Sequence, residues 1–324
     1  ENAEILALFQ ASGAYRPEED AIRGTSIADL EIVYLKEYFK KVYGREIEDF
    51  DQPLERMLRS LGILAVTGEV TRAGMLFFGK HPDLYERSFM VKAVAFAGDS
   101  IGDTTYIDSR DISGTVPWMF RESMTFLKSV LRHQQQGQNF NSVGILEIPE
   151  VVLEELVQNA LVHIDLLHEA AVRLLVFNDR IEIINPGCLY GGLQVEDIKL
   201  GVSRQRNPLM ATLAAKTMIY RGLGSGIIRV MKEGVCVDFK SNRFVLYTVF
   251  FCGKQKLSDC FFIRKVANGT SGSIHHFIRH HRNAAEQNGA GADDFAFVIS
   301  FDKADPFPLF FYFAPSGGLH HMSF

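Results

Sequence analysis

The chain has 324 residues, 47% of them hydrophobic, which is enough for two ordinary domains and excludes an intrinsically disordered protein. Its formal net charge of −5 excludes a global positive field that would hold the chain on nucleic acid. Four cysteines without CxxC spacing indicate reduced core thiols and no zinc site. No apolar run approaches the roughly 18 residues of a membrane span, and no signal peptide opens the chain, so we expect a cytoplasmic protein without membrane contact. Because the chain begins at Glu1 without a methionine, we expect further residues upstream.

Residues 1–145 are expected to form an α/β domain of their own. Apolar residues recur at helical spacing in four of its segments: residues 1–10, the stretch from a Ser26–Asp29 capping box to Gly44, residues 54–62, and the stretch that begins at Pro117. Residues 88–98 have the composition of a buried strand. The last helix ends at the glutamine-rich stretch HQQQGQNFNSVG, which we take as the domain boundary.

Residues 146–252 alternate helix and strand, which predicts a two-layer α/β sandwich with helices on one face of a sheet. A helix from Pro149 to about His163 is followed by two strands around the turn Asn178-Asp179. After a loop-rich stretch, Asn207-Pro208 predicts the start of another helix, and two further strands close the domain. The remaining residues, 253–324, hold six of the ten histidines and form an atypical tail of unknown structure.

Two polar side chains on the helix after Pro149 are candidates for chemistry. Glu155 and Asn159 are four residues apart, so they share one helix face, about 40° from each other. The apolar face adjoins them, which places the pair at the seam where a ligand cleft forms. A carboxylate there can deprotonate a water molecule, and an amide oxygen can bind Mg²⁺. Alone, the pair also fits an ordinary solvated helix.

Two glycine turns follow this helix in the sequence. The strand RIEII runs into Asn185-Pro-Gly187, where glycine permits close approach of the backbone to a ligand. The second turn, RGLGSG at residues 221–226, precedes a helix and offers backbone N–H groups to phosphate. It does not follow a strand in a βαβ unit, which argues against a dinucleotide-binding motif.

The order and spacing of these motifs resemble those of GHKL ATPases, whose ATP site is of the Bergerat type. The segments ELVQNALVHID, VFNDRIEIINPG, GGLQVEDIKLGVSRQRNPLMA and YRGLGSGIIRV resemble the C-terminal ATPase domain of a bacterial and archaeal family of transcriptional regulators and helicase-related proteins. The resemblance extends over about residues 1–252 and implies that residues 1–145 are the smaller α/β connecting domain of this family. Members of this family usually carry a Schlafen/AlbA-type DNA-binding domain, which would lie upstream of Glu1.

The resemblance implies ATP and Mg²⁺ as cofactors and a role for each matching position. Glu155 is the implied general base and Asn159 the implied Mg²⁺ ligand. Asn185 and Gly187 would line the adenine pocket. The implied phosphate-binding positions lie in the glycine turn and in the lid before it: Gly222, Gly224, Gly226, Arg206 and Asn207.

Two positions depart from the family pattern. Asn185 stands where GHKL enzymes have an aspartate, so the hydrogen bond to the adenine amino group would lack its charge. His163 and Asp165 belong to a motif usually written His-Arg-Asp, in which Ile164 replaces the arginine. We therefore expect weak nucleotide binding and at most slow hydrolysis.

The resulting expectation is an ATP-binding regulatory protein that contacts nucleic acid through its upstream domain and forms a homodimer. A lid at about residues 188–226 would respond to nucleotide. One alternative is a degenerate GHKL fold that serves as a non-catalytic interaction module, and a second is a protein kinase of the histidine-kinase or anti-sigma type. A GxxxxGK stretch at residues 74–80 is followed by histidine in place of the hydroxyl residue of a P-loop, so no Walker-type helicase motor is expected.

Overall fold

The computed structural model describes residues 2–102, 105–134, 145–222, 224–233, 237–241, 245–251, 297–300, 309–313 and 319–322. The chain divides into two compact units, Glu1–Gly253 and Lys254–Phe324. In the second unit the described strands are antiparallel in the order β11-β10-β9, with bounds Leu319–Met322, Leu309–Phe313 and Phe297–Ser300. Most of the expected tail, and most of the glutamine-rich stretch, lie outside the described residues.

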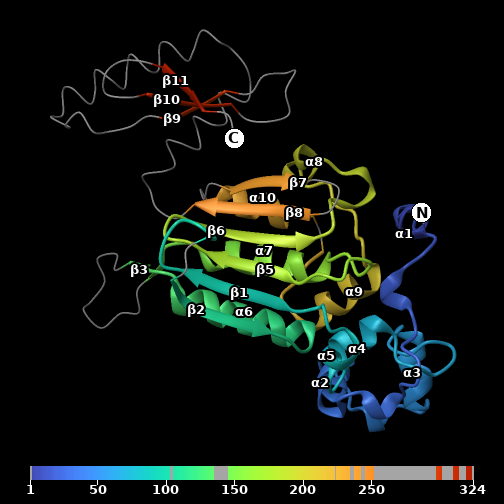
Figure 1. Ribbon diagram of the computed structural model, residues 1–324. Coiled ribbons are helices and arrows are strands. Elements are labelled where there is room, and N and C mark those ends of the chain that lie inside the picture. The colour runs from blue at the N-terminus through green and yellow to red at the C-terminus, as the bar shows by residue number, and fades with distance from the viewer. Residues whose placement is uncertain are drawn as a thin grey trace. The chain divides into compact units, whose positions relative to one another are not determined.

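A six-stranded mixed sheet forms the centre of the first unit (Figure 1). Its order is β2-β1-β5-β6-β8-β7, and only the β1–β5 pair is parallel. The strands are β1 (Val91–Phe96), β2 (Tyr106–Ile112), β5 (Val172–Val176), β6 (Arg180–Pro186), β7 (Val237–Ser241) and β8 (Val245–Phe251). The mixed α/β class expected from the sequence is confirmed.

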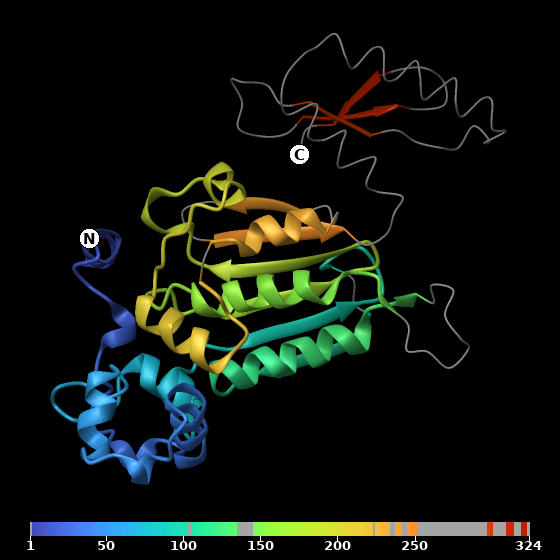
Figure 2. The same ribbon diagram turned by 180° about the vertical axis from the view of Figure 1, so that it is seen from behind.

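Three helices cover one face of this sheet, as the reverse view shows (Figure 2). They are α6 (Val116–Val130), α7 (Glu150–Val162) and α10 (Gly226–Lys232). Helix α7 packs its fully apolar side on the sheet: Leu153, Leu161 and the strand residue Ile183 are each at most 2% exposed. The helix α9 (Pro208–Thr217) lies at the end of α7. A layer of helices on a sheet is the arrangement predicted for residues 146–252.

Residues 2–86 form helices joined by loops and isolated β-bridges. They form α1 (Asn2–Ser12), α2 (Ile32–Tyr43), α3 (Leu54–Ser60), α4 (Arg72–Phe78) and α5 (Pro82–Tyr85). Helix α2 ends at Gly44, whose φ of 69° is the left-handed C-cap conformation that glycine adopts without strain. The short strands β3 (His133–Gln134) and β4 (Ile145–Leu146) pair with each other at the base of the glutamine-rich stretch.

The sheet and its layer of helices include elements from both sides of the boundary expected at residue 145. Strands β1 and β2 come from the first segment, yet they extend the sheet of the second segment, with Val91 paired to Val172. Helix α6 packs beside α7 in the same layer. One continuous core joins the N-terminal helices to the sheet. The domain limits therefore stay predictions, while the described residues up to 251 lie in one compact unit.

In the described residues no helix combines the length and the apolar character that crossing a membrane requires.

Candidate functional site

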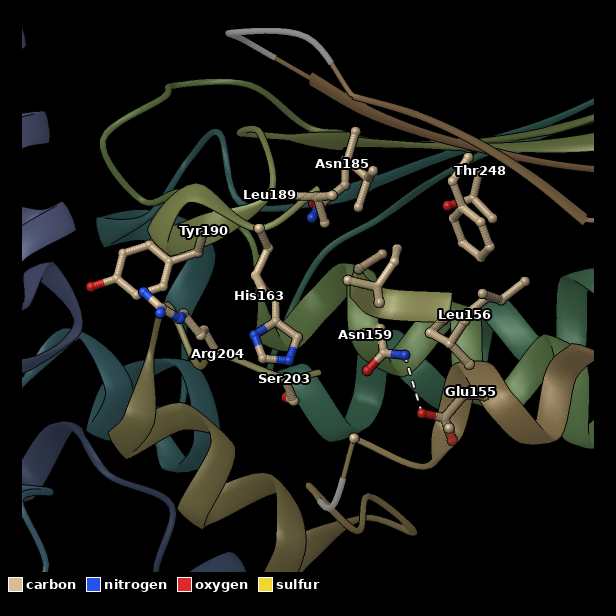
Figure 3. Close-up of a pocket in the computed structure, with 18 of the residues that line it drawn as sticks. Glu155, Leu156, Asn159, His163, Asn185, Leu189, Tyr190, Ser203, Arg204 and Thr248 are labelled. Atoms are coloured by element: carbon tan, nitrogen blue, oxygen red, sulfur yellow. Dashed lines mark hydrogen bonds between the residues drawn. The ribbon is translucent and has the colours of Figure 1, made fainter. Parts of the chain in front are cut away.

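A cavity lies between α7, the end of β6, strand β8 and two loops (Figure 3). We call the first loop, residues 188–206, the cap loop; it contains the short helices η4 (Tyr190–Gly192) and α8 (Val195–Lys199). The second loop, described at residues 220–222 and 224–226, is called the glycine loop and leads into α10. The sequence motifs that are far apart along the chain thus meet around one hollow.

The acid and the amide predicted from the sequence both face this cavity. Asn159 Nδ2 donates to Glu155 Oε1 over 3.1 Å, and Arg229 Nη2 donates to Glu155 Oε2 over 2.6 Å. Because the nitrogen of Asn159 is turned to the carboxylate, its oxygen points to the other side, toward His163 (Figure 3). An amide oxygen placed in this way can coordinate Mg²⁺.

Asn185 places an unsatisfied acceptor in the cavity wall. It lies on β6 opposite Leu246 of β8 and is 5% exposed. Its Oδ1 is buried and has no hydrogen-bond partner among the described residues. Thr248, which is also buried, lines the same wall from β8 (Figure 3). Leaving a buried acceptor unpaired costs about 1–3 kcal/mol, so this wall can gain from a ligand that brings a donor.

His163 ends α7 and forms a neutral hydrogen-bonded pair with Tyr220. The two side chains are 2.9 Å apart between Nε2 and the phenol oxygen. Burial, with a smaller contribution from the Arg206 guanidinium, lowers the pKa of His163 to about 4. Burial, with a smaller contribution from the charge of Glu155, raises the pKa of Tyr220 to about 12. Both groups are therefore uncharged at neutral pH, and this side of the cavity offers hydrogen bonds without charge.

Arg206 and Asp165 form a buried ion pair at the base of the cap loop. Their side chains are only 4% and 7% exposed, and Arg206 Nη1 lies 2.9 Å from Asp165 Oδ2. Arg206 also donates to the carbonyl of Cys188, and to the side chain of Gln10 from helix α1. His168 is a further partner of Asp165. The sequence placed Arg206 near phosphate; in the structure it lines the cavity, but its guanidinium is committed to protein partners.

Asn207 and Gly187 hold the loops in place and do not line the cavity. Asn207 precedes α9 as its N-cap but makes no side-chain cap; its Nδ2 donates to the carbonyls of Val162 and Ile164 at the end of α7. Gly187 has a φ of 98°, and a Cβ there would lie 2.5 Å from Asp165 Cβ. These positions, and Asp165 itself, support the site from behind its wall.

The three glycines of the glycine loop all line the cavity, and each meets a different neighbour. Gly224 has a φ of 69°, and a Cβ on it would lie 2.5 Å from the carbonyl oxygen of Gly201 in the cap loop. A Cβ on Gly226 would lie 1.5 Å from Glu155 Oε1. Glycine is therefore required at Gly224, where the loop meets the backbone of the cap loop, whereas a side chain at Gly226 would displace the carboxylate of Glu155.

Sequence reasoning missed several cavity residues. Arg204, Arg221 and Arg229 all line the cavity, together with Tyr220 and Thr248. Arg229 was within reach of a sequence argument, because a basic residue one helical turn after a glycine loop faces the same ligand as the loop. Ile164, which replaces the arginine of the family motif, is 2% exposed and packs in the core. Among the described residues no group of three or more histidine, cysteine, aspartate or glutamate side chains could hold a metal ion by itself.

Comparison with known proteins identifies the class of one segment of this unit. Residues 169–243 match the family model described as "Putative ATP-dependent DNA helicase recG C-terminal". The matched segment is ATPase-like. This ATPase-like segment runs from just before β5 to the end of β7, so it contains Asn185, the cap loop, the glycine loop and Arg229. Helix α7, with Glu155 and Asn159, lies just before it.

A solved structure shows a similar fold. The DIP2311 protein from Corynebacterium diphtheriae superimposes with a TM-score of 0.56 over 78% of this chain, at 18% sequence identity. The match covers 51% of that protein, so this chain spans about half its length. No curated protein matches the chain. The fold around the ATPase-like segment is therefore one that a bacterial protein shares.

Proposed function

We propose that the cavity is a GHKL-type site for ATP and Mg²⁺ and that the chain is part of an ATP-binding regulatory protein. The observation that carries this proposal is the unpaired Oδ1 of Asn185, buried in the wall opposite α7. An adenine amino group is a donor that would satisfy it. The ATPase-like match of residues 169–243 supports the same conclusion from sequence.

The residues present fit each part of the ligand. Asn185 would accept from the adenine, with Thr248 beside it. Backbone N–H groups of the glycine loop would face the phosphates, which suits an anion. Asn159 would hold Mg²⁺ through the oxygen that is turned away from Glu155. The bound cation would neutralise phosphate charge. The residues of this chain thus supply binding, orientation and exclusion of water.

Hydrolysis at this site would be slow. Glu155 is the residue placed to accept a proton from water, but its Oε2 is shared with Arg229 over 2.6 Å. Water must therefore compete with a guanidinium for that oxygen. The same ion pair favours the alternative of a degenerate fold that acts as an interaction module, and the experiment below decides between the two. The histidine-kinase reading has no comparable support in the site.

The wider role follows from the family resemblance and is part of the proposal. Nucleotide would alter the cap and glycine loops, and contact with DNA or RNA would be made by a domain outside this chain. A homodimer in the cytoplasm is the assembly proposed, since two-fold pairs are the commonest soluble oligomers. The binding experiment on the cavity does not depend on any of these features.

Calorimetric titration of the whole chain with ATP, with and without Mg²⁺, tests the site. Asn185→Ala is expected to weaken ATP binding about tenfold, since it removes a buried hydrogen bond to the ligand. Asn159→Ala should abolish the gain in affinity that Mg²⁺ gives. Glu155→Gln should retain binding and lose turnover. The matched control is Glu154→Gln, on the next position of α7 and outside the cavity.

Each outcome has a definite meaning. Binding that responds to the cavity variants and not to Glu154→Gln supports the proposal. Absence of binding at millimolar ATP would sink it and favour the interaction module. Binding that is indifferent to Asn185→Ala and Asn159→Ala would place the nucleotide elsewhere.

A further inference from the structure

Arg229 is a charged side chain in the cavity whose hydrogen bonding is incomplete. It rises from α10, one turn after Gly226, and its side chain is 33% exposed. Its Nη2 contacts Glu155 Oε2 at 2.6 Å, yet its Nε is buried and has no hydrogen-bond partner among the described residues. A guanidinium presents five N–H donors in a rigid fork, and Glu155 satisfies only one edge of it.

The carboxylate of Glu155 occupies the place of an anion beside the glycine loop. It lies against the Cα of Gly226 so closely that a Cβ there would be 2.0 Å from its Cδ. Glu155 is the one acidic side chain among the described residues that line the cavity, whereas four arginines line it. The side chains that line the cavity therefore carry one negative and four positive charges, and the negative one lies at the end of the glycine loop.

Two of the other three cavity arginines are held by protein partners, and the third, Arg221, is exposed at the start of the glycine loop. Arg206 is held by the buried Asp165, and Arg204 Nη1 donates to the carbonyl of Gly191 over 2.8 Å. Arg229 differs because its partner stands in the cavity itself, so a more highly charged anion can replace that partner. A terminal phosphate has more charge and more acceptor oxygens than a carboxylate and matches the fork of an arginine.

We propose that Arg229 binds the terminal phosphate of the nucleotide in place of Glu155. The site would thereby distinguish a triphosphate from a diphosphate. This inference rests on the proposed ATP site. In the absence of triphosphate the Arg229–Glu155 pair closes the end of the cavity. With triphosphate bound, Arg229 turns to phosphate oxygens, its Nε gains an acceptor, and Glu155 loses its cation.

The test compares ATP and ADP titrated into the whole chain with Mg²⁺. Arg229→Gln is expected to weaken ATP binding by about tenfold or more, the effect of losing a charge-assisted hydrogen bond, and to change ADP binding by less than about twofold. Arg229→Lys, which keeps the charge but not the fork, should recover part of the ATP affinity. Lys232→Gln is the matched control, an exposed cation on the next turn of α10.

Glu155→Gln tests the same exchange from the other end of the pair. Because it frees Arg229 without removing it, ATP affinity should rise severalfold, opposite in sign to Arg229→Gln. The inference is overturned if Arg229→Gln leaves the ATP/ADP ratio unchanged, or if both variants shift ATP affinity in the same direction. If the wild-type chain binds both nucleotides and the variants give either of these results, the proposed function stands and the role of Arg229 is refuted. A wild-type chain that binds neither nucleotide fails the proposed function itself.

Discussion

Gly226→Ala is expected to destabilise the protein only while Glu155 keeps its carboxylate. The new Cβ would lie 1.5 Å from Glu155 Oε1 and 2.0 Å from Cδ, so the carboxylate must move. Gly226 is the first residue of helix α10, and its φ is not in the left-handed region. Alanine is therefore compatible with the backbone there and by itself favours the helix by up to about 1 kcal/mol.

The loss of stability comes from the contacts that the displaced Glu155 carboxylate gives up. It loses the hydrogen bond from Asn159 and the ion pair with Arg229. The pair is 17% exposed on the Glu155 side and 33% on the arginine side, so solvent screens part of its energy. We take about 2 kcal/mol for the two contacts together, which exceeds the helix term. Gly226→Ala should then cost about 1 kcal/mol in the wild type and stabilise a Glu155→Ala background by up to about 1 kcal/mol.

Urea denaturation of the wild type, the two single variants and the double variant measures this coupling. The expected interaction energy is about 1–2 kcal/mol, well above the few tenths seen for independent sites. Combining Gly226→Ala with Glu154→Ala provides the matched control, and these two should be additive. If Gly226→Ala and Glu155→Ala are also additive, the carboxylate does not lie on Gly226, and the geometry on which the site is built is wrong.

Two further predictions concern groups beside the cavity. Because the pKa of His163 is lowered to about 4 from 6.5, the unfolded chain takes up the proton first as the pH falls. Stability that is present above pH 6.5 is then lost toward pH 4, by about 3 kcal/mol more than in His163→Gln, which does not titrate there; equal pH slopes in urea denaturation would refute the shift. Arg206→Met should cost about 3–5 kcal/mol because it leaves Asp165 buried without its guanidinium, and a thermal midpoint within two degrees or so of the wild type would contradict this.

Local patterns predicted the parts of the site that depend on one segment. Helix α7 follows from its apolar periodicity, and the β5–β6 hairpin follows from two apolar strands around the Asn178-Asp179 turn. The spacing of Glu155 and Asn159 along α7 placed both on the cavity side. In each case the information lies within four residues along the chain, the range over which helical and strand periods act.

Long-range pairing could not be predicted in the same way. The sequence assigned the strand at residues 88–98 to a separate domain, but β1 adds to the sheet beside β5, 81 residues further along by the Val91–Val172 pair. Periodicity shows that a strand has an apolar face and does not show which strand will pair with it. The division at residue 145 rested on a change of composition, and the sheet extends across it.

The partners of the cavity arginines could not be predicted from the sequence either. Arg206 and Arg229 are alike in sequence terms, since both lie near glycine turns in an ATPase-like segment. What separates them is the partner: Asp165 is 7% exposed behind the wall, whereas Glu155 stands in the cavity. If Arg206 turned to a ligand, the buried carboxylate of Asp165 would lose its partner at a cost of about 3–5 kcal/mol. A typical phosphate contact contributes less than this. Drawing Arg229 away leaves Glu155 in a space that ligand or water can reach. An arginine's availability to a nucleotide therefore depends on where its carboxylate partner is placed.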